Sequence, residues 1–205
     1  MKSVVIGVVG WMVMLGSSAM AQAADDQGRF GIKGVGGLSC SRYLEAFQSK
    51  DEGYLMHLGW FGGYLTGVNQ RMEDTFDLLP WQSVGLVSYA VADICRQAPQ
   101  ASVLQAMQAV IRGVKAERLT EASPMVSAKG ERAEITIYQA ALIRVQQALK
   151  KSGFYEGEIH GRYDSATREA LERFQEAKGL TVTGLPDQRT LLTLFKKQGK
   201  GGGKE

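Results

Sequence analysis

Cysteine and histidine are scarce in this 205-residue sequence, which contains two of each. The cysteines, Cys40 and Cys95, are too far apart for a CxxC zinc knuckle, and only His57 and His160 could join them as ligands. We therefore expect no metal and no other cofactor. Neither cysteine lies in or just after the apolar run near the N-terminus, which argues against a lipid-anchored lipoprotein.

Familiar catalytic motifs are also absent. The sequence has no HExxH, no Ser-x-x-Lys pair, and its one His-Gly pair, at His160, is not followed by a cysteine. Two carboxylates that cleave a glycoside have no fixed sequence spacing, so a hydrolase with an unrecognised active site stays open as an alternative. The first folded region is short for most such enzymes, and we expect a protein that is not an enzyme.

Charge of one sign is not concentrated anywhere. The formal net charge is only +3, and the basic residues are dispersed along the chain. Nucleic-acid binding is therefore not indicated.

The N-terminus has the pattern of a secretory signal peptide. Lys2 precedes an uncharged, largely apolar run over residues 3–19, and Ala21 and Ala23 are the small residues that a signal peptidase requires. A retained membrane helix is the alternative, but the polar residues that follow favour cleavage after Ala23. We expect a mature chain that works in the periplasm, with no membrane insertion after cleavage.

Cys40 and Cys95 both lie in this mature chain. In an oxidising compartment an even pair of cysteines predicts a disulfide, and a free buried pair is the alternative. In the chain-entropy model such a long closed loop stabilises a fold by about 4 kcal/mol.

Apolar periodicity predicts that residues 39–118 form four helices. A stripe at steps of three and four, from Leu58 through Phe61 and Leu65 to Val68, marks the longest of them. The expected helices cover residues 40–48, 51–77, 80–97 and 101–118.

Three glycines, Gly59, Gly63 and Gly67, lie four residues apart in the longest predicted helix. Each costs the helix about 1 kcal/mol relative to alanine, so the pattern needs a reason. Close approach of another helix in the core is the favoured one. A membrane dimer face is weaker, and a third interpretation is a partner-binding groove flanked by aromatic residues, namely Trp60, Phe61 and Tyr64.

The C-terminal region predicts three short helices around one small core. Leu142, Val145 and Leu149 form an apolar stripe, and Asp164 is placed to cap the next helix. No internal repeat is evident, and Gln146 and Gln175 are expected to hydrogen-bond loop backbone.

The C-terminal region contains a dense series of motifs. They are Val145-Gln146-Gln147-Ala148-Leu149, Gly153-Phe154-Tyr155, Gly157, Gly161, Asp164-Ser165-Ala166-Thr167-Arg168, Ala170, Phe174-Gln175, Gly179-Leu180, Thr183-Gly184, Asp187 and Thr190. With these motifs the region resembles the peptidoglycan-binding domain found on many cell-wall hydrolases. The resemblance implies a three-helix bundle that attaches non-covalently to peptidoglycan. One departure is His160-Gly161, where the family usually has Asp-Gly.

The expected ligand contacts lie on the glycine loop and on the helix start that follows it. Aromatic rings there could stack on sugars, and arginines could bind stem-peptide carboxylates. The candidates are Tyr155, His160, Arg162, Tyr163 and Arg168.

The first folded region combines Cys40, the segment 60–67, the segment 89–95 and Pro99. In this arrangement it resembles a family of small periplasmic helical domains. That family includes immunity proteins that neutralise type VI secretion effectors, and its fold is similar to an acid-stress chaperone. It implies a protein-binding role.

The sequence thus predicts an all-α protein with two small helical domains, a disulfide-linked four-helix domain and a three-helix bundle. We expect a non-catalytic envelope protein that binds peptidoglycan and a protein partner; an immunity-like or chaperone-like protein and a wall hydrolase are the alternatives. The expected organisation is a signal peptide at 1–23, a flexible lead-in at 24–38, the helical domain at 39–118, a linker at 119–134, the peptidoglycan-binding-like domain at 135–197 and a disordered tail at 198–205.

Overall fold

The computed structural model describes residues 24–196. The predicted signal peptide (1–23) and the whole of the predicted disordered tail (198–205) lie outside the described residues. Among the described residues, 24–32 belong to one compact unit and 33–196 to a second. In the first unit, the carboxylate of Asp25 accepts the backbone N–H groups of Gln27 and Arg29 and pairs with the Arg29 guanidinium at 3.0 Å.

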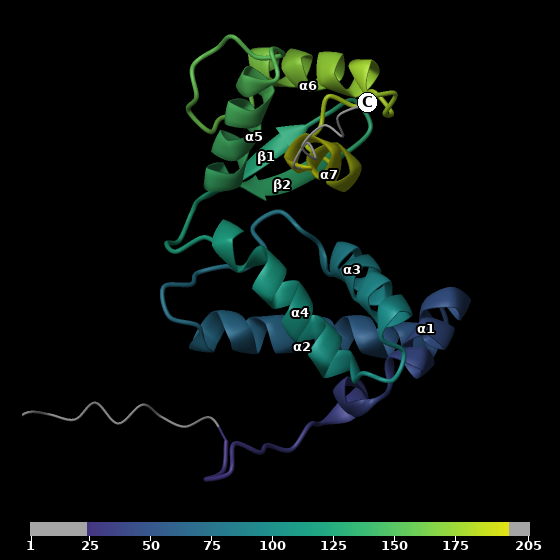
Figure 1. The fold of residues 1–205 in the computed structure, drawn as a ribbon. Coiled ribbons are helices and arrows are strands. Elements are labelled where there is room, and N and C mark those ends of the chain that lie inside the picture. Colours follow the sequence, from purple (N-terminus) through teal and green to yellow (C-terminus); the bar gives the residue numbers. More distant parts are fainter. Residues whose placement is uncertain (1–23, 197–205) are drawn as a thin grey trace, which may run out of the picture. The chain divides into compact units, whose positions relative to one another are not determined.

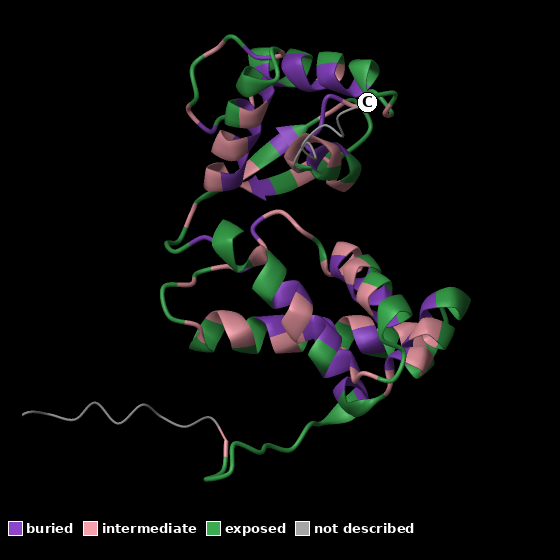
Figure 2. Cartoon of the chain, in the orientation of Figure 1, coloured by how far each residue is buried: buried purple, intermediate pink, exposed green. Residues whose placement is uncertain are grey.

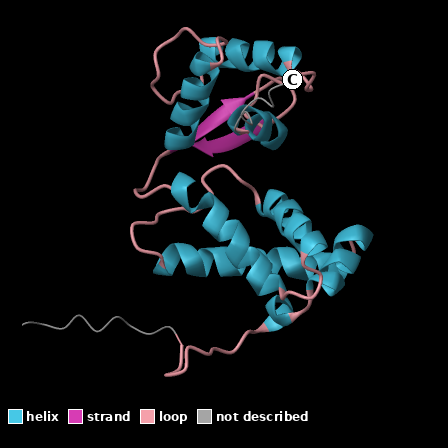
Figure 3. Cartoon of the chain, viewed as in Figure 1, coloured by secondary structure: helices cyan, strands magenta, loops and turns pink. Residues whose placement is uncertain are grey.

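The described part of the second unit is mostly helical (Figures 1 and 3). One small antiparallel sheet corrects the expectation of an all-α protein. The predicted division into two helical domains is not confirmed, because residues 33–196 belong to one compact unit. The α-helices are α1 (Cys40–Ser49), α2 (Glu52–Arg71), α3 (Val84–Gln97), α4 (Val103–Val114), α5 (Gln139–Lys151), α6 (Ser165–Ala177) and α7 (Gln188–Phe195); the strands are β1 (Met125–Lys129) and β2 (Glu134–Tyr138); short 3₁₀ turns cover Gly34–Gly37 and Lys115–Glu117.

Side-chain caps explain where most of the helices begin. Ser83 accepts the backbone N–H of Leu86, so α3 starts at Val84 and not at Pro80 as expected. Ser102 and Gln105 form a reciprocal capping box at the start of α4. The other capping residues are Ser39, Asp51, Asp164 and Asp187.

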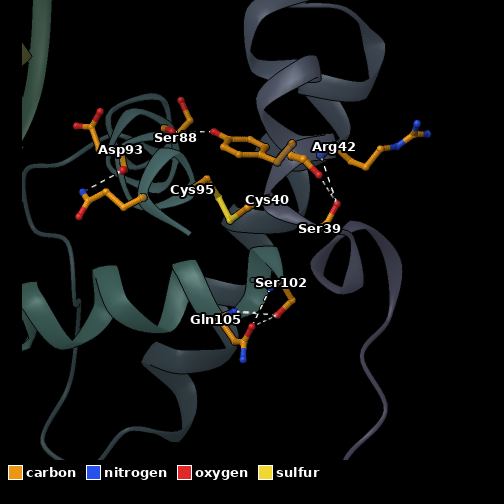
Figure 4. The surroundings of a disulfide bond; sticks show 11 residues. Ser39, Cys40, Arg42, Ser88, Asp93, Cys95, Ser102 and Gln105 are labelled. Atoms are coloured by element: carbon orange, nitrogen blue, oxygen red, sulfur yellow. Dashed lines mark hydrogen bonds between the residues drawn. A yellow bond between two sulfur atoms is a disulfide. The ribbon is translucent and has the colours of Figure 1, made fainter. Parts of the chain in front are cut away.

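The predicted disulfide between Cys40 and Cys95 is confirmed. It joins the first residue of α1 to the last turn of α3, with an S–S distance of 2.05 Å, and both cysteines are fully buried (Figure 4). Beside it the Tyr43 hydroxyl donates to the carbonyl of Ser88 at 2.7 Å, and burial raises the pKa of this tyrosine. The bond therefore closes a core to which α1, α2, α3 and α4 all contribute.

Part of the predicted flexible lead-in is packed. The indole N–H of Trp60 donates to the carbonyl of Lys33 at 2.8 Å, and Val35 is buried. A Cβ atom at Gly36 would lie 2.0 Å from the Trp60 ring, so only glycine allows this segment to approach α2.

The glycine face of α2 does not pack in the core, so the favoured interpretation of this pattern is wrong. A Cβ atom added at Gly59, Gly63 or Gly67 would meet nothing within 4 Å. The same helix exposes Leu55 and Met56, whose exposed fractions are 61% and 64%. Figure 2 shows that exposed, intermediate and buried positions follow one another along α2. The apolar stripe led by Phe61 packs inward, and the glycines face away from it.

The segment expected as a linker contains β1, which pairs with β2. Val126 pairs with Ile137 and Ala128 with Ile135, and the side chains of Ala128 and Ile137 are buried. The sheet therefore adds a small apolar face beside α5, where an irregular segment was predicted.

Candidate functional site

Gln146 organises the glycine loop that follows α5. Its side chain is fully buried. The amide oxygen accepts the backbone N–H groups of His160 and Gly161 at 3.0 and 2.8 Å, and the amide nitrogen donates to the Arg162 carbonyl and the Thr167 hydroxyl. The prediction that this glutamine bonds loop backbone is confirmed.

Gln175 makes the same set of bonds one loop later. Its amide oxygen accepts the backbone N–H groups of Thr183 and Gly184 at 2.8 and 2.9 Å, and its nitrogen donates to the Leu185 carbonyl and the Thr190 hydroxyl, both at 2.9 Å. The chain therefore contains two copies of one loop motif. The prediction that the sequence has no internal repeat is therefore wrong. The pattern Gly-x-x-Asp-x-x-Thr occurs at residues 161–167 and again at 184–190.

Both copies depend on a glycine with left-handed backbone. Gly161 and Gly184 have φ angles of 69° and 66°. A Cβ atom would lie 2.6 Å from Gln139 Cγ in the first copy and 2.6 Å from Arg168 Cγ in the second. Any other residue at either position would therefore suffer both backbone strain and a steric clash.

An aspartate follows three residues after each glycine and caps the next helix. Asp164 accepts the backbone N–H of Thr167 and Asp187 that of Thr190, both at 2.9 Å. Burial by itself would raise the pKa of Asp164, but the hydroxyl and N–H of Thr167, together with His160, lower it below its usual range.

The ring of His160 takes the place of the Thr183 hydroxyl. Its Nδ1 accepts the backbone N–H of Arg162 at 3.0 Å, and its Nε2 lies 3.1 Å from the Asp164 carboxylate. In the second copy the Thr183 hydroxyl accepts the Leu185 N–H at 3.2 Å and donates to Asp187 at 3.1 Å. His160 therefore contacts both the loop backbone and the capping aspartate from the position where the family usually has aspartate.

Two of the predicted ligand contacts are structural tyrosines. Tyr155 is a core residue with 3% of its surface exposed, and its hydroxyl donates to the Glu158 carbonyl at 2.7 Å. Tyr163 is half-buried and donates to the Gly184 carbonyl, and burial raises its pKa. The expectation that Tyr155 offers a face to a sugar ring is corrected, because its ring lies inside the fold.

Of the five predicted contacts, only Arg162 and Arg168 are exposed. Arg168 lies 3.6 Å from the Glu172 carboxylate, whereas the guanidinium of Arg162 makes no ion pair within residues 24–196. The arginines are available to an anion, but no exposed aromatic ring of the predicted set accompanies them.

A cavity of about 520 Å³ in the described part of the chain is lined by none of the five predicted contacts. Two smaller cavities measure about 280 and 210 Å³. No group of three or more metal-binding side chains occurs among residues 24–196, and no helix described there has the length and apolar character of a membrane span. The large cavity is lined by Trp81, Ala116, Glu117, Arg144, Gln147, Ala148, Lys151 and Phe195.

Comparison with protein families identifies the region that contains both loop copies. Residues 138–194 match the PG_binding_1 family, described as a peptidoglycan binding domain. The match runs from the end of β2 into α7 and supports the resemblance inferred from the C-terminal motifs. Comparison of the whole chain with curated proteins and with solved structures gave no match.

Proposed function

We propose that this chain binds peptidoglycan non-covalently through residues 138–194. The observation that carries the proposal is the family match over these residues. The two glutamine-centred loops support it, because they join three short helices of these residues in one small fold. This domain would keep the protein at the cell wall.

We further propose that the protein is non-catalytic and works in the periplasm after its signal peptide is removed. The sequence of residues 1–23 and the Cys40–Cys95 disulfide support an oxidising compartment. The lack of familiar nucleophile and metal motifs in the sequence supports a binding role.

The helical region would then present a surface to a protein partner. The exposed side of α2 supports this role, because Leu55 and Met56 lie beside a backbone that carries no side chains at Gly59 and Gly63. An immunity-like or chaperone-like protein would need such a surface as well, so these alternatives are versions of the same proposal.

Co-sedimentation with purified sacculi tests wall binding. The chain from Ala24 onward should pellet with sacculi and remain in solution with cellulose, an insoluble glycan without stem peptides. A protein that stays in the supernatant with both would contradict wall binding. Release of soluble muropeptides during prolonged incubation would instead support the hydrolase alternative.

A further inference from the structure

The cavity of about 520 Å³ combines residues that are far apart in the sequence. Arg144, Gln147 and Lys151 come from the outer side of α5, Phe195 ends α7, and Trp81 lies in the loop before α3. Its volume falls within the range of about 300–1,000 Å³ that is typical of small-molecule sites. None of the five ligand contacts predicted from the sequence lines this cavity.

One wall of the cavity is aromatic. The ring centroids of Trp81 and Phe195 are 5.2 Å apart, and Trp81 packs against the core formed by α5, α6 and α7. The Trp81 loop is also tied to α7, because Gln188 donates to the Trp81 carbonyl and accepts the backbone N–H of Ser83 at 2.8 Å. The indole is therefore held in place before any ligand arrives.

A second part of the cavity lining is cationic. Arg144 and Lys151 are seven residues apart on α5 and so lie on one side of it, with the exposed amide of Gln147 between them. Arg144 is fixed by hydrogen bonds to the carbonyls of Glu117 and Arg118. Lys151 is exposed and has no ion pair among the residues the structure describes, and Glu117 is the single acid lining the cavity.

We infer that this cavity is a subsite for a muropeptide, with a sugar ring against Trp81 and Phe195 and a carboxylate between Arg144 and Lys151. Amphipathic sugar faces pack on aromatic rings, and carboxylates form charge-assisted bonds with arginine and lysine. The glycine loop offers the arginines without an open aromatic face, since Tyr155 is buried. The inference rests on the proposed wall binding and deepens it by naming where the ligand lies.

Charge reversal at Lys151 tests the subsite. Lys151→Glu should weaken binding of a soluble disaccharide-peptide by about tenfold or more, because a charged hydrogen bond is lost and repulsion is added. Lys151→Arg should retain binding. Lys178→Glu is the matched control, since Lys178 is also exposed, lies outside the cavity and gives the same change in net charge.

Tryptophan emission gives a second readout that does not depend on charge. In the chain from Ala24 onward, Trp60→Phe leaves Trp81 as the only tryptophan, and its emission should change when the disaccharide-peptide is added. Sacculus binding that is equally strong in Lys151→Glu and Lys178→Glu, with no emission change, would overturn the subsite and leave wall binding intact. If the unsubstituted protein does not bind sacculi at all, both the subsite and the proposed wall binding are overturned.

Discussion

Gln146 on α5 and Gln175 on α6 are equivalent in their hydrogen bonds, and the buried amide of each binds two backbone N–H groups and one carbonyl of the loop that follows its helix. Gln175→Leu would leave the N–H groups of Thr183 and Gly184 and the carbonyl of Leu185 without their partner. An unsatisfied buried polar group costs about 1–3 kcal/mol. We therefore expect the free energy of unfolding to fall by about 3 kcal/mol or more, measured by urea denaturation.

Gln147→Leu is the control for this experiment. Gln147 is a glutamine on α5 whose side chain is exposed, so the same substitution there should alter the free energy of unfolding by less than about 0.5 kcal/mol. Equal effects of the two leucine substitutions would contradict the central role of the buried amides.

His160 should be replaceable by the residue found at the same place in the second loop. His160→Ala removes the acceptor for the Arg162 N–H and the partner of Asp164, and should cost about 1 kcal/mol. His160→Thr should recover much of this loss, because the Thr183 hydroxyl makes the equivalent bonds. Thermal unfolding followed by circular dichroism would compare them, and a threonine variant no more stable than the alanine variant would contradict the equivalence.

Asp164 should make the fold less stable in acid. Its pKa is lowered in the folded state, so its stabilising contribution is present above the unfolded pKa of about 4 and is lost as pH falls through the lower folded pKa. Asparagine also caps helices well but does not titrate. Between pH 7 and pH 3, unfolding free energy should therefore fall less in Asp164→Asn than in the unsubstituted protein; an equal fall in both would exclude this group.

Local features of the fold were the most predictable from the sequence. Asp164 caps α6 as predicted, because the cap needs only a side chain and a backbone N–H three residues away. The Cys40–Cys95 disulfide also follows from simple counting in an oxidising compartment. These interactions are set by short spacing or by a single possible pairing.

Features that depend on distant partners were not predicted. β1 and β2 are each five residues long, and their stability comes from pairing with each other, which no short window of sequence reveals. The four-residue spacing of the glycines correctly predicted that they lie on one side of α2. Spacing alone does not show which side of a helix another helix covers. The muropeptide subsite was missed for the same reason, because Trp81 meets Phe195 only in the folded chain.

The exposed glycines of α2 lead to a prediction of increased stability. Gly63 has open space where a Cβ atom would lie, so Gly63→Ala meets no clash and gains helix propensity. We expect the free energy of unfolding to rise by about 0.5–1 kcal/mol. Gly36→Ala is the opposite control, because its Cβ atom would lie 2.0 Å from the Trp60 ring and should destabilise the protein. A loss of stability in Gly63→Ala would mean that this side of α2 is covered in solution, for example by a partner or a second copy of the chain, and analytical ultracentrifugation of the same samples would detect a second copy directly.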